Sequence, residues 1–268
     1  MRTLNADRST APIAASGLSI QDFDPQTFDL LGLRSDLKVK WFDCRNAMLY
    51  PQDGTTTRYL MPAYLPCDID LYQRFWPIAQ IVTEPRWLDT GGTIFTLYEL
   101  NGRAILEALG TQLALRPVWI GGETFSSRRP EGDLEPTHLP LDLSGLNLLG
   151  WETDRVEAKP GEGLDLFTYW EVTQPITPPL KIFVHVSAPD GAIVAQWDGL
   201  DVNVGTLEAH DVFVQRHRID FPAAQSVPPG PYRISIGAYH PDSGTRLQAQ
   251  VGDRAVDSVV LGTLTLVK

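Results

Sequence analysis

The stretch LDLFTYWEV, residues 164–172, decides the fold of the second half of this chain. Leu164, Leu166 and Trp170 fall on one face of an extended strand, and Asp165 falls on the other. Similar two-faced stretches follow at 181–188, 192–198, 212–221, 231–241 and 259–267. Turns rich in Pro and Gly separate these stretches, and no helical pattern lies between them. This pattern predicts an antiparallel β-sandwich of the immunoglobulin or jelly-roll type over residues 145–268.

The alternation also predicts which side chains fill the core of that sandwich. The expected core residues are Leu166, Trp170, Phe183, Val194, Ile234, Ile236 and Leu264. The last stretch, 259–267, is rich in β-branched residues and carries no charge. A strand of this kind at an exposed sheet edge invites pairing with another chain. We therefore expect it to lie inside a sheet, with a neighbour on each side.

The first part of the chain follows a different pattern. Helical signals at 22–33, 68–75 and 104–113 are interspersed with strand signals at 37–43, 47–50, 58–63 and 94–100. This order predicts a small α/β domain over residues 8–115. Residues 116–144 are rich in Gly, Pro, Ser and charge, which is typical of a linker or long surface loop. The predicted fold class is therefore an α+β two-domain chain, a small α/β domain followed by an antiparallel β-sandwich.

Composition excludes several classes of protein. The chain of 268 residues is 43% hydrophobic and 21% charged, values typical of a folded globular protein. Its net charge of −11 argues against a nucleic-acid partner, because binding to phosphates needs clustered Lys and Arg. No stretch approaches the roughly 18 apolar residues that a membrane-spanning helix requires. The N-terminus lacks the apolar region of a secretion signal, so a cytoplasmic location stays open.

The two cysteines, Cys44 and Cys67, have two interpretations. They form one disulfide in an oxidising compartment, or they are two buried free thiols. Their spacing matches no metal motif, and we predict no metal and no cofactor. The nucleophile elbow, the phosphate-binding loop and the HExxH and CxxC motifs are all absent from the sequence. We therefore assign no catalytic residue, and His185 and His217 are expected to be structural.

Two groups of residues are candidates for ligand binding. Trp76 and Trp87 adjoin prolines at expected element ends and are candidates for stacking on sugar rings. Asp43 and Arg45 follow a predicted strand, and Arg45 together with Arg58 is a candidate grip for an anionic group. The alternative for Asp43 and Arg45 is an ordinary surface ion pair.

Several motifs resemble a known family. The runs LLGWETD (148–154), KIFVHVSAPDG (181–191) and PPGPYRISIGAY (228–239) resemble a sandwich module of bacterial multi-spanning membrane glycosyltransferases. These enzymes are of the dolichyl-phosphate-mannose protein mannosyltransferase type. The runs LKVKWFDCRNAMLYP (37–51) and TRYLMPA (57–63) are similar to the segment that follows the last membrane helix in such enzymes.

The resemblance implies an extracytoplasmic C-terminal region without the membrane part, with a possible membrane tether upstream. Nothing in this chain matches the family's catalytic loop, so its transfer activity is carried over to no residue. The first expectation is a non-catalytic accessory region that binds glycan or a cell-envelope protein at the cell surface. The alternative is a soluble hydrolase or transferase with an anionic-ligand site near Asp43, Arg45 and Arg58.

Overall fold

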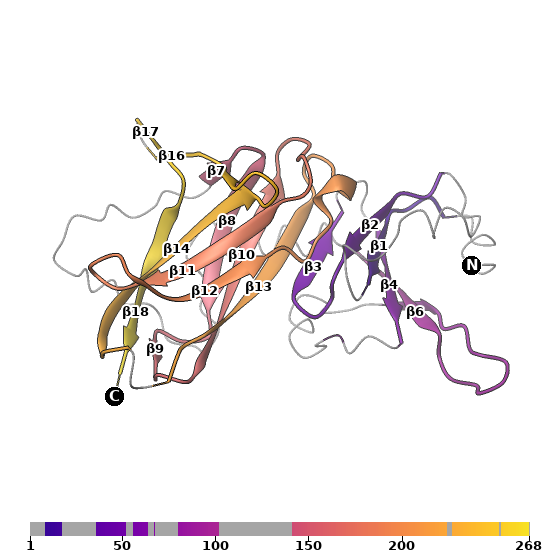
Figure 1. The fold of residues 1–268 in the computed structure, drawn as a ribbon. Coiled ribbons are helices and arrows are strands. Elements are labelled where there is room, and N and C mark those ends of the chain that lie inside the picture. The colour runs from indigo at the N-terminus through magenta and orange to yellow at the C-terminus, as the bar shows by residue number, and fades with distance from the viewer. Residues whose placement is uncertain are drawn as a thin grey trace. The chain divides into compact units, whose positions relative to one another are not determined.

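The computed structural model describes residues 9–17, 36–51, 56–63, 67, 80–101, 141–223, 227–251 and 253–267 (Figure 1). The chain forms two compact units. Unit 1 comprises Met1–Gly110 and Asp201–Val214, and unit 2 comprises Thr111–Leu200 and Gln215–Lys268. Within the described ranges, the secondary structure consists of strands and one short 3-10 turn, η1 (Val204–Thr206).

The predicted α+β class is wrong, because the described part of unit 1 is a β-sheet and not an α/β layer. The three helices expected at 22–33, 68–75 and 104–113 lie outside the described residues. The described residues also contain no helix long and apolar enough to cross a membrane. The described chain between these three segments pairs as strands.

Unit 1 contains a five-stranded sheet in the order β2-β1-β4-β6-β5. The strands are β1 (Ile13–Ser16), β2 (Val39–Phe42), β4 (Thr57–Pro62), β5 (Gln80–Thr83) and β6 (Phe95–Leu100). β1 runs parallel to both β2 and β4, while β4–β6 and β5–β6 are antiparallel. All four residues of β1 are buried, as expected for a parallel strand covered on both faces. The core cluster of the five-stranded sheet comprises Ile13, Ala15, Trp41, Leu60, Phe95 and Leu97.

A segment from far along the chain, Asp201–Val214, completes unit 1. The backbone N–H of Asp43 donates to the carbonyl of Asp201 at 2.8 Å, and the N–H of Asn203 donates to Trp41 at 2.9 Å. Asn203 also caps η1, because its side-chain oxygen accepts from the N–H of Gly205. The sequence analysis assigned this segment to the sandwich.

The same segment supplies the partner of a buried lysine. The ammonium of Lys40 donates to both carboxylate oxygens of Asp211, at 2.8 and 2.9 Å, and to Glu208 at 3.2 Å. The side chains of Lys40 and Asp211 are 2% and 1% exposed. Because a buried charge is costly unless it is paired, these contacts hold the 201–214 segment against β2.

Unit 2 consists mainly of two sheets. The first has the order β17-β16-β7-β8-β10-β13-β3, and the second has the order β12-β11-β14-β18-β9. The first sheet is built from β7 (Leu141–Leu143), β8 (Leu146–Thr153), β10 (Gly163–Val172), β13 (Val212–Asp220), β16 (Ala249–Val251) and β17 (Arg254–Val256). The second is built from β9 (Glu157–Ala158), β11 (Lys181–Ser187), β12 (Ile193–Gly199), β14 (Gly230–His240) and β18 (Val259–Leu266), with β15 (Thr245–Arg246) beside β14. The pairs β8–β10, β11–β14 and β14–β18 are antiparallel, whereas β9 runs parallel to β18.

The ends of these sheets add two details. β3 (Ala47–Tyr50) belongs to unit 1, as do Val212–Val214, the first residues of its neighbour β13.

β7 lies inside the predicted 116–144 linker, yet it pairs with β8 and β16. Residues 116–140 of that linker lie outside the described ranges. β18 pairs with β14 along its length and with β9 at Thr265 and Leu266, so the expectation that the last strand is paired on both sides is confirmed for its C-terminal end only.

The two sheets of unit 2 touch through aromatic side chains. The indole of Trp151 on β8 lies against Gly262 on β18, where an added Cβ would come within 3.0 Å of the ring. The ring of Trp197 on β12 meets that of His217 on β13 edge-on, at 4.5 Å between centroids. These contacts join the two layers as in a β-sandwich.

Most of the predicted core residues are buried, namely Leu166, Trp170, Ile234, Ile236 and Leu264. Val194 is only half-buried, so that prediction is wrong. The register shows why: Val186 pairs with Ala195 and Ser187 pairs with Ile193, which leaves Val194 as the extra residue of a bulge. Ala195 takes the buried position instead.

His217 is buried as a neutral group. A hydrogen bond of 2.7 Å joins its Nε2 to Oγ1 of Thr168, which also accepts from the indole N–H of Trp170 at 2.7 Å. Its Nδ1 has no hydrogen-bond partner among the described residues. Burial lowers the pKa of His217 to about 3, because the charged imidazolium would lose its hydration inside the sandwich.

Candidate functional site

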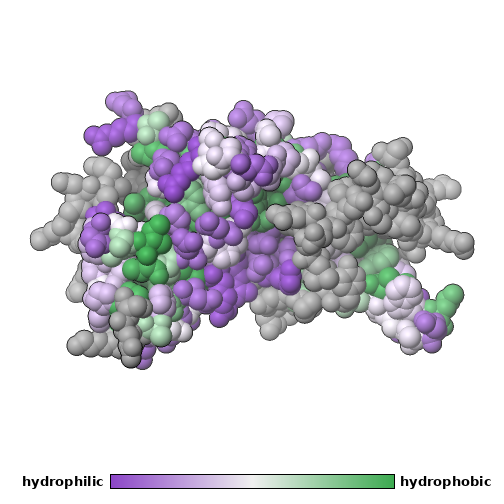
Figure 2. All heavy atoms as spheres, in the orientation of Figure 1, coloured by the Kyte–Doolittle hydropathy of each residue, from purple (hydrophilic) through white to green (hydrophobic). Residues whose placement is uncertain are grey.

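The outer face of the second sheet of unit 2 carries an unusual set of side chains. On β11, Ile182, Val184 and Val186 point into the sandwich, so Phe183 and His185 point outward. The outer surface of these strands mixes hydrophilic and hydrophobic residues (Figure 2). Phe183 was predicted to be a core residue, and it is indeed only 2% exposed. It is nevertheless on the opposite face from the core, where other outward-facing side chains cover it.

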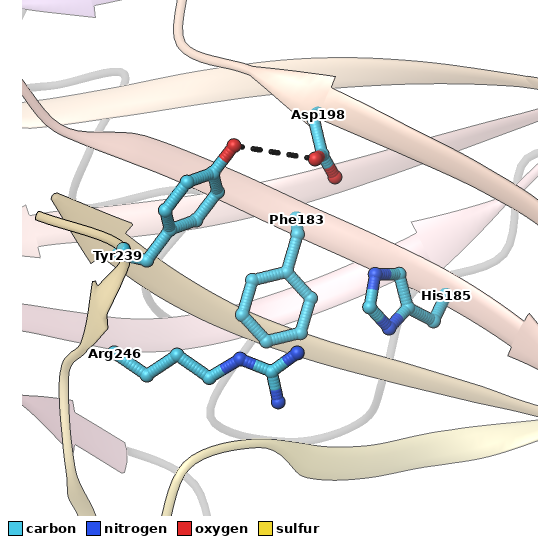
Figure 3. Close-up of a pocket in the computed structure, with 6 residues that line it drawn as sticks. Phe183, His185, Asp198, Tyr239 and Arg246 are labelled. Atoms are coloured by element: carbon cyan, nitrogen blue, oxygen red, sulfur yellow. Dashed lines mark hydrogen bonds between the residues drawn. The ribbon is translucent and has the colours of Figure 1, made fainter. Parts of the chain in front are cut away.

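Strand register brings the neighbours of Phe183 together. Phe183 pairs with Asp198 on β12 and with Gly237 on β14, and Tyr239 pairs with Arg246 on β15. Residues on paired strands at matching positions share one face of a sheet. They line a pocket of about 220 Å³ together with His185 and the turn residue Gly244 (Figure 3).

Phe183 forms the floor of this pocket, which we call the outer-face pocket. Its ring lies directly over Gly237, where an added Cβ would come within 2.3 Å of the ring, so only glycine fits there. Arg246 places its guanidinium over the same ring, 4.8 Å from the centroid. An ion pair of 2.8 Å with Asp257 holds Arg246 in this position. The rings of His185 and Tyr239 lie 4.6 and 6.2 Å from that of Phe183.

The polar groups at the rim offer both hydrogen-bond donors and acceptors. Tyr239 donates its hydroxyl to Oδ2 of Asp198 at 3.3 Å (Figure 3). Burial raises the pKa of Tyr239, and the Asp198 carboxylate adds to that shift. Burial lowers the pKa of His185, with Asp198 opposing and Arg246 assisting the shift. The imidazole of His185 is therefore neutral near pH 7 and can accept or donate one hydrogen bond.

This arrangement is suited to binding. The half-buried ring of Tyr239, with the Asp198 carboxylate and the Arg246 guanidinium nearby, can hold a polar ring by stacking and by hydrogen bonds. The five side chains include no serine, threonine or cysteine that could act as a nucleophile beside His185. Within the described ranges, no group of three or more His, Cys, Asp or Glu side chains is placed to hold a metal ion.

The predicted site residues lie elsewhere, in unit 1. Trp76 is outside the described residues. Trp87 is 55% exposed and follows β5 in the connection to β6. Asp43 and Arg45 form an ion pair in which Nε of Arg45 donates to both carboxylate oxygens, at 2.9 and 3.0 Å. The hydrogen bond to Asp43 raises the pKa of Arg45.

Arg58 lies away from the Asp43–Arg45 pair. Arg58 pairs with Ile13 at the start of β1, whereas Asp43 follows Phe42, which pairs with Ser16 at the end of β1. Because β1, β2 and β4 run parallel, the two positions lie at opposite ends of these strands. The buried Arg58 guanidinium donates to the carbonyl of Ala11 at 2.6 Å.

The sequence pattern did not predict the outer-face pocket. His185 was interpreted as a lone strand histidine and Phe183 as core, because period-two alternation does not say which face is inside when both carry large side chains. The sequence does contain one signal for this pocket. Phe183 and Tyr239 each occupy the face of their strand opposite to the face that carries the aliphatic residues.

A disulfide joins Cys44 to Cys67, whose Cα atoms are 5.1 Å apart. The structure therefore favours the first of the two interpretations of these cysteines. Cys44 directly follows Asp43 at the end of β2, and its backbone N–H donates to the hydroxyl of Ser16 at 3.0 Å. The disulfide ties Cys67 to the C-terminal end of β2.

Comparison with known proteins adds little. No protein-family profile and no curated protein matches this chain. Among solved structures, the C-terminal domain of Wzt is similar over 46% of this chain and 74% of that domain, with 12% sequence identity and a TM-score of 0.32. A likeness at that level carries no argument about function.

Proposed function

We propose that this chain is a non-catalytic, extracytoplasmic accessory region of a membrane glycosyltransferase-like protein, and that unit 2 binds glycan through the outer-face pocket. The observation that carries the proposal is the grouping of Phe183, Tyr239, Asp198 and Arg246 on one outward face. A pyranose ring has an apolar face that stacks on aromatic rings, and hydroxyls that need acceptors and donors at its edge. The pocket offers each of these.

The size of the pocket limits what enters it. About 220 Å³ is below the range of sites for drug-sized ligands, so one sugar residue of a longer chain is the expected occupant. A cell-envelope protein bearing such a glycan is the corresponding partner. We do not propose the hydrolase or transferase alternative, because Arg58 lies at the other end of the strands from Asp43 and Arg45.

Two features support an extracytoplasmic location. The Cys44–Cys67 disulfide persists in oxidising compartments and is rare in the cytosol. The resemblance of the 37–63 and 148–239 motifs to the extracytoplasmic region of membrane glycosyltransferases points the same way. Thiol alkylation before and after reduction, followed by mass spectrometry of protein from its native cells, tests this location. Two alkylated cysteines before reduction would contradict it.

A glycan array probed with the full chain tests the binding proposal. We expect the native protein to bind a subset of glycans, and Asp198→Asn to weaken that binding about tenfold by removing a charged acceptor. Asp253→Asn is the matched control, since Asp253 is an exposed acid of unit 2 outside the pocket. A native protein that binds no glycan, or an equal loss in both variants, would overturn the proposal.

A further inference from the structure

The connection between β5 and β6 carries a concentration of exposed apolar side chains. Of the six large hydrophobic residues that are exposed within the described ranges, four lie on this hairpin. Ile81 and Val82 on β5 are 57% and 48% exposed, Trp87 is 55% exposed, and Leu88 is fully exposed. In Figure 1 the hairpin extends beyond the rest of its sheet, and hydrophobic atoms occupy its end in Figure 2.

The backbone of the hairpin tip is hydrogen-bonded within itself. The N–H of Trp87 donates to Gly92 at 2.8 Å, that of Gly91 donates to Trp87 at 2.9 Å, and that of Ile94 donates to Pro85 at 2.9 Å. At the apex, the N–H of Thr90 donates to the carboxylate of Asp89 at 2.8 Å. A segment can enter a medium poor in water only if its backbone groups are satisfied internally. These bonds satisfy the N–H groups of Trp87, Thr90, Gly91 and Ile94 within the tip.

The size of the apolar tip argues against a protein partner. A stable interface between proteins buries about 800 Å² on each side and involves about 20 residues or more. The tip offers two side chains, Trp87 and Leu88, at the end of a narrow hairpin. A bilayer makes no such demand, because each inserted apolar side chain contributes independently.

The side-chain types at the tip fit the interfacial layer of a bilayer. Tryptophan prefers the headgroup level, where its ring is in an apolar setting and its N–H remains hydrated. Leu88, next to it and fully exposed, would reach deeper. The charged residues of the hairpin connection are Glu84, Arg86 and Asp89, with a net charge of −1 (one positive and two negative), within a chain of net charge −11. This charge disfavours an anionic surface.

We propose that the β5–β6 hairpin tip inserts Trp87 and Leu88 into the interface of a zwitterionic lipid bilayer. The proposal rests on unit 1 alone and does not depend on glycan binding by unit 2. It assigns Trp87 to lipid and not to sugar, because its fully exposed neighbour Leu88 is apolar.

Flotation of the full chain with phosphatidylcholine vesicles tests this proposal. We expect the native protein to float with the vesicles, and Trp87→Ser and Leu88→Ser each to lower the partition coefficient about tenfold. Ile193→Ser is the matched control, since Ile193 is 50% exposed on β12 of unit 2. Thermal melting should be unchanged in all three variants, because the replaced side chains are exposed. Native protein that stays with the buffer, or an equal loss with Ile193→Ser, would overturn the proposal.

Three further measurements exclude the other occupants. Adding phosphatidylglycerol to the vesicles should weaken binding at low salt, and stronger binding there would contradict the assignment to a zwitterionic surface. Sedimentation velocity without lipid should give the same species for native protein and Leu88→Ser. A native dimer that Leu88→Ser dissociates would mean that the tip docks on a second copy. Binding of the Trp87→Ser variant to glycans should equal that of the native protein, and a loss there would assign Trp87 to sugar instead.

Discussion

The two units are built from the same kind of secondary structure, but different interactions hold them together. Unit 1 has strands of four to six residues, a core cluster of six buried residues, a disulfide and a buried Lys40–Asp211 ion pair. Unit 2 has strands of up to eleven residues and an extended apolar core. Short strands bury little apolar surface, so a small sheet relies more on cross-links and paired charges.

The two units also differ in the kind of polar group that they bury. Unit 1 buries an ammonium and a carboxylate together, and the charge of each is compensated by the other. Unit 2 buries the neutral imidazole of His217, which has one hydrogen bond to Thr168. Removing one member of the ion pair should therefore destabilise unit 1 more than unit 2. Protonating the imidazole should destabilise unit 2 more than unit 1. The predictions below test this contrast.

The largest effect is expected from Asp211→Ala. This change removes the closest carboxylate from the buried ammonium of Lys40, and the Glu208 carboxylate is more distant; breaking comparable buried pairs costs about 3–5 kcal/mol. Hydrogen exchange measured by mass spectrometry should show faster exchange in β1, β2 and β4, with β11 and β14 unchanged. Replacing both partners, as Lys40→Met with Asp211→Leu, should restore most of the protection. Equal loss of protection in both units would refute the contrast.

A somewhat smaller effect is expected when the disulfide is removed. Cys44 and Cys67 are separated by 23 positions, and closing a loop of about that length stabilises a fold by about 3 kcal/mol. The Cys44→Ala, Cys67→Ala double variant should unfold at lower urea concentration when followed by exchange in unit 1. The exchange of unit 2 strands in the same sample is the internal control. If the unit 2 strands lose as much protection, the disulfide does not act on unit 1 alone.

Lowering the pH by one unit should destabilise unit 2 less than either of the two changes above destabilises unit 1. The pKa of His217 is about 3 in the folded chain and returns to its ordinary value of 6.5 on unfolding. The unfolded chain therefore binds the proton more readily. Stability from the neutral imidazole is fully present above pH 6.5 and falls by up to about 1.4 kcal/mol per pH unit as the pH drops toward 3.

Denaturation of the native chain and of His217→Gln at several pH values checks this dependence. The difference in unfolding free energy between the two should shrink as the pH falls below 6.5, because only the native chain must release that proton on folding. His240→Gln serves as the control, since His240 is a partly exposed histidine of unit 2. A constant difference between native chain and His217→Gln from pH 7 to pH 4 would show that His217 accepts a proton in the folded state.

Local patterns in the sequence predicted much of unit 2 and less of unit 1. The alternation in residues 164–172 and 231–241 correctly gave strands and buried faces, because a strand with one buried face has a period of two. The bulge at Val194 was not predictable from that pattern, since it is a property of the pairing between β11 and β12. Strand β5 was not predicted at all, because its four residues face solvent and show no alternation.

The functional residues were hardest to predict because they meet only through register. The outer-face pocket joins β11, β12, β14 and β15, and its residues come from three separate stretches of sequence, at 183–185, 198 and 239–246. The same holds for Lys40 and Asp211, which are 171 positions apart. Predicted candidates chosen for their positions at strand ends, such as Arg58, were separated by the parallel arrangement of β1, β2 and β4.

The return of the chain to unit 1 at Asp201–Val214 has a consequence for biosynthesis. During translation, Lys40 leaves the ribosome 171 residues before Asp211 does. At 5–20 residues per second this interval lasts roughly ten to thirty-five seconds. Throughout it the first sheet lacks the carboxylate that compensates its buried lysine, so its final form cannot be reached while only the N-terminal part exists. A nascent chain stalled before residue 201 should therefore be cleaved by proteases in unit 1, whereas one stalled well beyond residue 214 should resist.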